Sequence, residues 1–313
     1  MRNFETDPLR VAMLGYIPEN NHPYSWSAII NGFDPENMAR CPAPVIFQYL
    51  SKQPPGSVRI PFARVTHLWT DNPSEAAGVA AAACIPRVVT KPEDVLGEVE
   101  AIIIATDEGD DHVRRVAPFA ESGLPIFVDK PLATNLSDLR QFIAWRKQGA
   151  KIISSSGLRY ASEVEALRGK NFRWITGTTC KSWARYGIHA LEPIYTMVGA
   201  GFERIRARQS GSTFLMEGKH RDGTLISIAA MEESYGSAFV FHGYADTEHV
   251  TAVVRDNYTA FRHQLMSFLE YASGKKPEAH PFSETVELMT ILIAAAQSAD
   301  RGGVDINPAE LLR

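Results

Sequence analysis

The sequence predicts an α/β protein of two domains: a doubly wound parallel sheet, followed by an α+β domain with a mainly antiparallel sheet. The chain has 313 residues, a length that favours about two domains. In the first half, short apolar runs alternate with helical patterns, as is typical of βαβ units. After Phe172 the runs are strand-like and separated by turns, and two long helical patterns follow. We therefore expect the domains to occupy residues 1–154 and 155–313.

The first half reads as alternating strands and helices. Arg10–Gly15 is a short apolar run ending in glycine, the pattern that opens a parallel sheet. Gly32–Pro61 is rich in proline and indicates an insertion before the second strand. Further strands are expected at Ala63–Trp69, Arg87–Val89, Ala101–Ala105, Pro125–Val128 and Lys151–Ser154, and helices at Ser25–Asn31, Val45–Ser51, Ser74–Ala83, Pro92–Leu96, Asp111–Ser122 and Asn135–Gln148.

The second half changes pattern. Two long helical patterns, Asn257–Ser273 and Ser283–Arg301, come at its end, and we expect them to cover one face of the antiparallel sheet. The strands of that sheet are expected at Arg173–Cys180, Glu203–Ser210, Ser212–Lys219, Thr224–Glu232, Ser237–Tyr244 and His249–Val254.

Composition and charge narrow the class of protein. The formal net charge is −4 and no basic block is present, which argues against nucleic acid as a partner. Three widely spaced cysteines, Cys41, Cys84 and Cys180, fit a reducing cytoplasm better than a disulfide framework. The N-terminal residues 1–10 are polar and contain no signal region. The longest apolar stretches are shorter than the roughly 20 residues that a membrane helix needs. We expect a cytoplasmic protein without a membrane partner.

Polar residues follow the strands of the first half. In a parallel α/β sheet, ligands bind outside the carboxyl ends of the strands, so these loops should line one crevice. The loops contain Gly15, Tyr16 and Ile17 after the first strand, Thr70 and Asp71 after the second, and Thr106, Asp107, Asp129 and Lys130 after later strands.

One of these loops carries a specific string. Ile126–Ala133 reads Ile-Phe-Val-Asp-Lys-Pro-Leu-Ala and resembles the Glu-Lys-Pro-Leu-Ala signature of the Gfo/Idh/MocA oxidoreductases. Upstream, Thr106 and His112 stand where that family has a Thr-containing loop and a His-bearing helix. Gly187–Glu192 is similar to its Gly-x-His-x-x-Asp helix start, and Pro281–Val304 to its last helix. The resemblance covers nearly the whole chain.

The resemblance implies an enzyme that uses NAD(P) to oxidise a sugar, cyclitol or related polyol, or to catalyse the reverse reduction. It implies that His189 is the general acid/base and that Lys130 orients the same hydroxyl. It also implies a Lys-Pro bond that is often cis, and a homodimer or homotetramer formed through the open sheet. The expected cofactor-binding residues are Gly15, Tyr16, Ile17, Thr70, Asp71, Thr106, Asp107, His112, Asp129 and Lys130. The expected substrate-binding residues are Lys181, Arg185, Tyr186 and Glu192, on a strand end and a helix start near His189.

The sequence departs from the family pattern at the first turn. A dinucleotide fingerprint reads Gly-x-Gly-x-x-Gly, whereas this turn has Gly15 alone, two prolines that lack an N–H, and the acidic Glu19. Asp71, with no arginine expected nearby, favours NAD over NADP. Arg185 stands where the family frequently has aspartate, and Lys181 and Arg185 would suit a substrate carboxylate or phosphate.

These departures leave two alternatives. His22, Asp107, Glu108, His112 and His189 could serve a non-redox enzyme, such as a lyase, an isomerase or a metal-assisted hydrolase, on the same scaffold. The sequence contains no metal motif of defined spacing, so we expect no bound metal. The other alternative is a non-catalytic sugar-binding protein, and the presence of Lys130 together with His189 argues against it.

Overall fold

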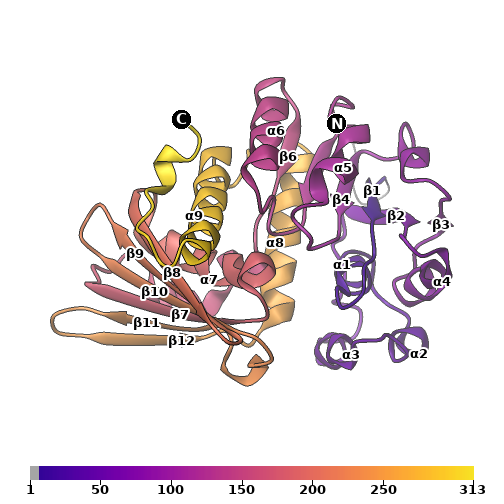
Figure 1. Cartoon of the computed structure of the whole chain (residues 1–313). Helices are drawn as coiled ribbons and strands as arrows, with labels where there is room; N and C mark the ends of the chain where they lie inside the picture. The colour runs from indigo at the N-terminus through magenta and orange to yellow at the C-terminus, as the bar shows by residue number, and fades with distance from the viewer. Residues whose placement is uncertain (1–6) are drawn as a thin grey trace.

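The computed structural model describes residues 7–313, which form two sheets placed side by side (Figure 1). Residues 1–6 of the polar N-terminal segment lie outside the described residues. Sheet A is wholly parallel, with the order β3-β2-β1-β4-β5-β6, and this confirms the predicted doubly wound sheet. Its strands are β1 (Leu9–Leu14), β2 (Ala63–Trp69), β3 (Arg87–Val88), β4 (Ala101–Ile104), β5 (Pro125–Val128) and β6 (Lys151–Ile153).

Helices cover both faces of sheet A. On β1, Val11 and Met13 pack with the cores of α1 and α4, while Ala12 and Leu14 pack with α5 and α6. Burial on both faces is why residues 11–14 of this strand form a continuous apolar run. The helices are α1 (His22–Asn31), α2 (Pro35–Met38), α3 (Pro44–Ser51), α4 (Pro73–Ala82), α5 (His112–Val116) and α6 (Leu136–Lys147), with 3-10 helices η1 (Pro92–Val95) and η2 (Ala117–Phe119).

The helix predicted at Asp111–Ser122 is shorter than expected. α5 ends at Val116, and the chain continues as the 3-10 helix η2. Pro118 has no backbone N–H with which to continue the α-helical ladder, so the long helix is interrupted at this point.

Sheet B is mixed, with the order β12-β11-β7-β10-β9-β8. Its pairs are antiparallel apart from β7 and β10, which run parallel. The strands are β7 (Trp174–Cys180), β8 (Phe202–Ser210), β9 (Thr213–His220), β10 (Leu225–Met231), β11 (Val240–Tyr244) and β12 (His249–Val253), accompanied by the 3-10 helices η3 (Gly157–Tyr160), η4 (Ser162–Leu167), η5 (Tyr235–Ser237) and η6 (Pro308–Glu310).

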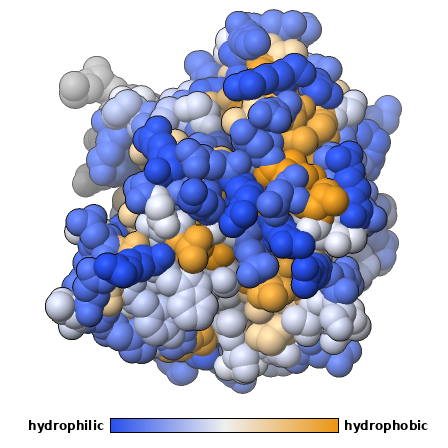
Figure 2. Space-filling model, turned by 60° about the vertical axis from the view of Figure 1, so that its left-hand side comes forward, coloured by the Kyte–Doolittle hydropathy of each residue, from blue (hydrophilic) through white to orange (hydrophobic). Residues whose placement is uncertain are grey.

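One face of sheet B packs against helices, and the other carries exposed apolar side chains. α7 (Trp183–Val198) and α9 (Phe282–Asp300) lie against the first face (Figure 1). On the strands, Trp174, Leu215 and Leu225 are 42%, 43% and 49% exposed. Figure 2, turned to bring this side of the molecule forward, shows apolar patches scattered among hydrophilic residues.

The prediction that both late helices cover sheet B is wrong for α8 (Asn257–Ala272). This helix packs on α1 and α3 of the first half (Figure 1). Its buried Leu265 and Phe268 share a core with Trp26 and Ile29 of α1. Helical periodicity identifies an apolar stripe but not the surface that the stripe will cover. Among residues 7–313, no helix has the length and apolar character to cross a membrane.

Candidate active site

The strand order of sheet A reverses between β1 and β4, where doubly wound sheets bind their ligands. The loops after these strands pack tightly. Gly15 has φ +97°, and a Cβ at this position would lie 2.6 Å from Cγ2 of Thr106. Only glycine permits both this backbone conformation and this approach. The loop after β5, which contains Asp129 and Lys130, joins them.

Lys130 is held inside a group of charges. It is 2% exposed, and its Nζ lies 3.5 Å from Asp107 Oδ2 and 3.6 Å from Asp129 Oδ2. Burial lowers the pKa of Lys130, but the two carboxylates outweigh burial and raise it. Burial raises the pKa of Asp107, but the positive charge of Lys130 outweighs burial and lowers it. Burial likewise raises the pKa of Asp129, but His22 and then Lys130 lower it below its usual value. The side chain of Lys130 is therefore held as a charged ammonium group. The Lys130–Pro131 peptide bond is cis, as the family resemblance implies.

His189 lies on the second turn of α7 and is 5% exposed. Its Nδ1 is 2.6 Å from Oγ of Ser156. Burial, and then the positive charges of Lys130 and His22, lower the pKa of His189 well below its usual value. The imidazole is therefore neutral at neutral pH. When Nδ1–H donates to Ser156, the lone pair is on Nε2, and the ring can accept a proton there.

The ring of Tyr186 joins the two halves of the site. Nζ of Lys130 lies 5.3 Å from its centroid, and the His189 ring lies 4.7 Å from it. Lys181 approaches the same ring, with Nζ at 4.8 Å. Lys130 and His189, far apart in sequence, thus contact one aromatic ring.

Lys181 and Arg185 each have carboxylate partners nearby. Arg185 Nη2 donates to Asp107 Oδ1 at 2.7 Å. Lys181 Nζ and Arg185 Nη1 lie 3.8 Å and 4.0 Å from the exposed carboxylate of Glu19, in the turn before α1.

The prediction that the helix begins near Gly187 is wrong, since α7 begins at Trp183 and includes Arg185 and Tyr186.

Glu192 lies one turn beyond His189 and is buried. Its Oε1 accepts a hydrogen bond from Ser156 N–H at 2.8 Å, and its Oε2 lies 3.6 Å from Arg159 Nη1. Burial raises the pKa of Glu192 to about 7. The carboxyl group thus holds the segment that carries the partner of His189.

The backbone N–H groups of the first turn already donate hydrogen bonds to protein acceptors. Gly15 N–H donates to Trp69 O, and Tyr16 N–H donates to Asp71 Oδ2, each at 2.9 Å. Ile17 is buried, and its carbonyl accepts Asn20 N–H at 3.2 Å. In pyrophosphate-binding turns the amides face the ligand instead.

Asp71 has an arginine partner that the sequence did not reveal. Arg115 of α5 contacts both of its carboxylate oxygens, at 2.8 Å and 3.1 Å. The expectation that no arginine lies near Asp71 is therefore wrong. Arg115 also pairs with Asp111 at 2.7 Å, so two carboxylates compensate its charge.

Two predicted cofactor residues bond to nearby backbone. His112 is fully buried, with Nε2 2.7 Å from Thr106 O and Nδ1 3.2 Å from Leu132 O. Thr70 Oγ1 donates to Asn72 O at 2.8 Å. Thr106 differs, because its hydroxyl is buried and without a hydrogen-bond partner among the described residues.

A dinucleotide therefore fits these residues unevenly. The positions of Lys130 and His189 would suit a nicotinamide and a reacting hydroxyl, and Asp71 follows β2, where dinucleotide-binding folds place the residue that holds the ribose. The first turn fits a pyrophosphate less well, because its amides bond to other groups and its Asn20 side chain donates to the Asp129 carboxylate. No group of three or more His, Cys, Asp or Glu side chains suited to a metal occurs within residues 7–313.

Sequence reasoning missed Ser156 and did not connect His22 with Lys130. Ser154-Ser155-Ser156 follows β6 directly, so the carboxyl-end rule applied to one more strand would have included Ser156. His22 contacts Asp129 from the start of α1, a pairing that no sequence spacing reveals.

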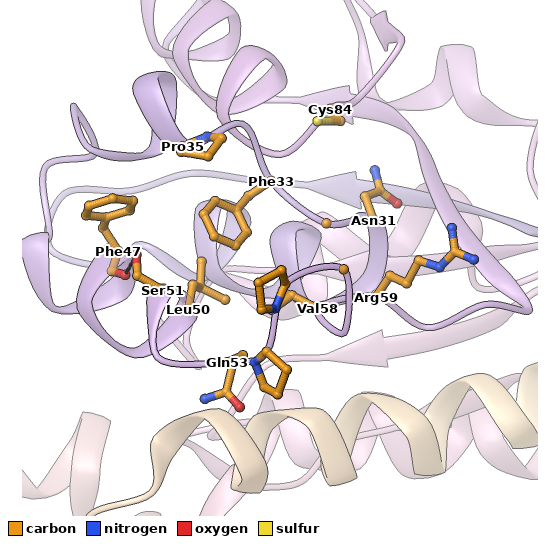
Figure 3. A pocket seen from close by; sticks show the side chains of 14 residues that line it. Asn31, Phe33, Pro35, Phe47, Leu50, Ser51, Gln53, Val58, Arg59 and Cys84 are labelled. Atoms are coloured by element: carbon orange, nitrogen blue, oxygen red, sulfur yellow. Dashed lines mark hydrogen bonds between the residues drawn. The ribbon is translucent and has the colours of Figure 1, made fainter.

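A separate hollow lies near the C-terminal end of α1 (Figure 3). It has a volume of about 640 Å³ and is lined largely by apolar side chains, among them Phe33, Phe47, Leu50 and Val58. α1 begins at the carboxyl edge of sheet A, so this hollow is at the opposite edge, away from Lys130 and His189.

Comparison with known proteins agrees with this geometry. Residues 49–156 match the family model GFO_IDH_MocA, described as oxidoreductase family, NAD-binding Rossmann fold. A search of curated proteins gave no match.

Solved structures match over nearly the whole chain. Myo-inositol 2-dehydrogenase from Lactobacillus plantarum has a TM-score of 0.75 at 13% identity, covering 96% of this chain and 99% of that one. Scyllo-inositol dehydrogenase from Lactobacillus casei, with bound NAD(H) and scyllo-inositol, has a TM-score of 0.75 at 10% identity, covering 97% and 100%. An oxidoreductase from Agrobacterium radiobacter in complex with NAD+, L-tartaric acid and magnesium has a TM-score of 0.74 at 12% identity, covering 97% and 99%. Residues 49–156 thus resemble the oxidoreductase family with an NAD-binding Rossmann fold, and the chain as a whole has the fold of these solved structures.

Proposed function

We propose that the protein is an NAD-dependent oxidoreductase that interconverts a hydroxyl and a keto group on a sugar, cyclitol or related polyol. The observation that carries the proposal is the meeting of Lys130 and His189 on the ring of Tyr186. The NAD-binding family match over residues 49–156 supports it. So does the presence of NAD(H) and scyllo-inositol in a structure of the same fold.

The two residues divide the acid–base work. When bound, the nicotinamide supplies the acceptor or donor of hydride. Nε2 of neutral His189 accepts the hydroxyl proton during oxidation and returns it during reduction. The ammonium of Lys130 donates a hydrogen bond to the same oxygen and stabilises its developing negative charge. Asp107 and Asp129 keep that ammonium charged and fixed.

Calorimetric titration of the cofactor-stripped protein with NAD+ and NADH, with NADP+ as the control, tests cofactor use. Micromolar binding of NAD supports the proposal, and turnover is then measured against polyols by the absorbance of the reduced nicotinamide. We expect His189→Ala to abolish turnover with NAD affinity nearly unchanged, while His263→Asn, at an exposed site on α8, keeps both. A folded protein that binds no NAD up to millimolar concentration would contradict the proposal.

The substrate is proposed to carry an acidic group. Among residues 7–313, the carboxylate paired with Lys181 is that of the exposed Glu19, at 3.8 Å, so a substrate carboxylate can replace that partner at low cost. The L-tartaric acid in a structure of the same fold is a hydroxy acid of this kind. Removing both charges, as Lys181→Met with Arg185→Met, should raise KM for a polyhydroxy carboxylate about 10-fold and leave KM for a neutral polyol unchanged. Equal KM values for the acid in both proteins would contradict this assignment.

We further propose that the protein forms a homodimer or homotetramer through the exposed face of sheet B. Trp174, Leu215 and Leu225 lie on adjacent strands of that face. Light scattering should report a dimer or larger, and Leu215→Glu combined with Leu225→Glu should reduce it to a monomer. Val88→Glu, at an exposed site on β3, is the matched control. A monomeric wild-type protein would exclude the assembly.

A further inference from the structure

We propose that the hollow near the C-terminal end of α1 is a binding site for an apolar carboxylate, separate from the candidate active site. The hollow has a volume of about 640 Å³, and small-molecule sites occupy roughly 300–1,000 Å³. It lies at the opposite edge of sheet A from Lys130 and His189, so the inference does not depend on the proposed function.

The walls of the hollow come from the proline-rich segment that the sequence indicates as an insertion. Thirteen of the fourteen lining residues lie between Asn31 and Arg59, at the end of α1, on α3 and in the loop that follows α3. Pro35, Pro54 and Pro55 are among them, and the fixed φ of proline stiffens the chain on either side of α3. The insertion supplies no residue of the candidate active site, and the hollow gives it a role.

The hollow presents apolar surface that the protein itself covers only in part. Leu50 and Val58 are 1% and 7% exposed, whereas Phe33 and Phe47 are half-buried. The two aromatic rings meet edge to face, with centroids 6.4 Å apart and an interplanar angle of 82°. An apolar ligand in contact with these rings would remove more of their surface from water, which is favourable.

The uncharged polar side chains of the lining already bond to the backbone. Asn31 donates to two carbonyls, one on β2 and one after α4, at 2.9 Å and 3.1 Å. Ser51 and Gln53 each donate to a carbonyl of α3, at 2.6 Å and 3.0 Å. The main group left to recognise a polar part of a ligand is therefore the one charge of the lining.

Arg59 supplies that charge. It is the one charged residue among the fourteen that line the hollow, it is exposed, and no carboxylate of residues 7–313 pairs with it. A guanidinium group binds a carboxylate through two parallel hydrogen bonds. One cation matches one negative charge, so the lining suits a ligand with a single carboxylate.

The arrangement determines how such a ligand lies. Figure 3 shows Phe47 and Arg59 toward opposite ends of the hollow, with Leu50 between them. An apolar body against the rings and a carboxylate at Arg59 would use both ends. A second negative charge would have no partner among the lining residues.

Calorimetric titration of the cofactor-free protein with octanoate tests the site, with 1-octanol as the uncharged probe of the same chain length. We expect Arg59→Met to weaken octanoate binding about 10-fold and to leave octanol binding unchanged, because only the carboxylate uses the guanidinium. Arg64→Met, at an exposed position on β2 outside the hollow, is the matched control and should bind octanoate as the wild type does. Phe47→Ala should weaken the binding of both probes, because it removes one ring.

A second measurement places the probe in the hollow. Cys84 lines the hollow and is exposed, whereas Cys41 and Cys180 are buried. The rate of reaction with N-ethylmaleimide therefore reports access to Cys84, and Cys84→Ser gives the background. We expect saturating octanoate to slow this reaction several-fold.

Three outcomes would overturn the inference. They are no binding of octanoate to the folded wild type, equal octanoate affinity in Arg59→Met and the wild type, and an unchanged reaction rate of Cys84 in saturating octanoate. Lys181→Met with Arg185→Met should keep full octanoate affinity, and a loss there would place the probe in the active-site crevice and overturn the inference as well. All these measurements are made without NAD, so the proposed function is tested separately by its own titration.

Discussion

Oγ of Ser156 lies 2.6 Å from Nδ1 of His189, so the hydrogen bond between them is coupled to the tautomer of the ring. Oγ also accepts Leu158 N–H at 3.1 Å, so the hydroxyl is itself oriented. A histidine whose Nδ1–H is held by a fixed acceptor presents the Nε2 lone pair to the substrate. The proposed mechanism therefore requires that Nδ1–H donates to the Ser156 hydroxyl, which leaves the Nε2 lone pair free.

Ser156→Ala should lower kcat on the order of 10-fold and leave KM and NAD affinity unchanged, because the tautomer is no longer fixed. The backbone N–H that holds Glu192 is retained in this variant. Ser155→Ala removes a buried hydroxyl from the neighbouring residue and is the matched control. Steady-state kinetics of the two variants measure this difference. Equal kcat values would contradict a role for the Ser156 hydroxyl.

Sequence reasoning predicted the fold of the first half well because its central strands β4 and β5 are short apolar runs. β2 and β5 have the predicted bounds, Ala63–Trp69 and Pro125–Val128. The same reasoning missed α2, and it placed α8 on sheet B, whereas α8 packs on α1 and α3. Periodicity is a local property, whereas the surface that an apolar stripe covers depends on residues far along the chain.

The candidate site was predictable where one strand end or one motif carries the residue, as for Lys130 and His189. Contacts between distant elements were not. Arg115 reaches Asp71 from α5, 44 positions along the chain, and His22 reaches Asp129 across 107 positions. Charge pairing of this kind depends on how several elements pack together, so no regular spacing in the sequence marks it.

The stability of the protein should depend on the protonation of Glu192. Burial raises its pKa to about 7 in the folded state, against 4.5 for an ordinary glutamate. A raised folded-state pKa means that the folded protein binds more protons than the unfolded chain between these values. The contribution is therefore fully present below pH 4.5 and is lost as pH rises through about 7.

Glu192→Gln stays uncharged and lacks this dependence. Relative to the variant, the wild type should lose roughly 3 kcal/mol of unfolding free energy between pH 4.5 and 7, taking about 1.4 kcal/mol for each pH unit. Urea unfolding of both proteins at pH 5 and pH 8 measures the change in their difference. A difference that is constant with pH would mean that Glu192 is ionised in the folded protein throughout.

Gly15→Ala tests the close approach of the loops after β1 and β4. The added Cβ would lie 2.6 Å from Thr106 Cγ2, at a φ of +97°. Gly97 also has a positive φ, +81°, with no atom near its Cβ position, so Gly97→Ala reports the backbone cost alone, about 1 kcal/mol. Gly15→Ala should cost about 1–3 kcal/mol more because of the overlap. Equal unfolding free energies for the two variants would show that the loops can separate freely.

Asp71→Asn should weaken the preference for NAD over NADP. In the wild type, Asp71 occupies Arg115 through both carboxylate oxygens, at 2.8 Å and 3.1 Å. The neutral amide would release part of that guanidinium, and it would not repel a 2′-phosphate. Arginine close to the end of β2 is the group that accommodates this phosphate in dinucleotide-binding folds. We expect the ratio of the Kd for NADP+ to the Kd for NAD+ to fall about 10-fold, or by roughly 1.4 kcal/mol.

Asp110→Asn, in the loop before α5, serves as the control for loss of one surface charge. Calorimetric titration of both variants with the two cofactors measures the ratio. An unchanged ratio in Asp71→Asn would mean that the adenosine end of the cofactor binds away from Asp71 and Arg115.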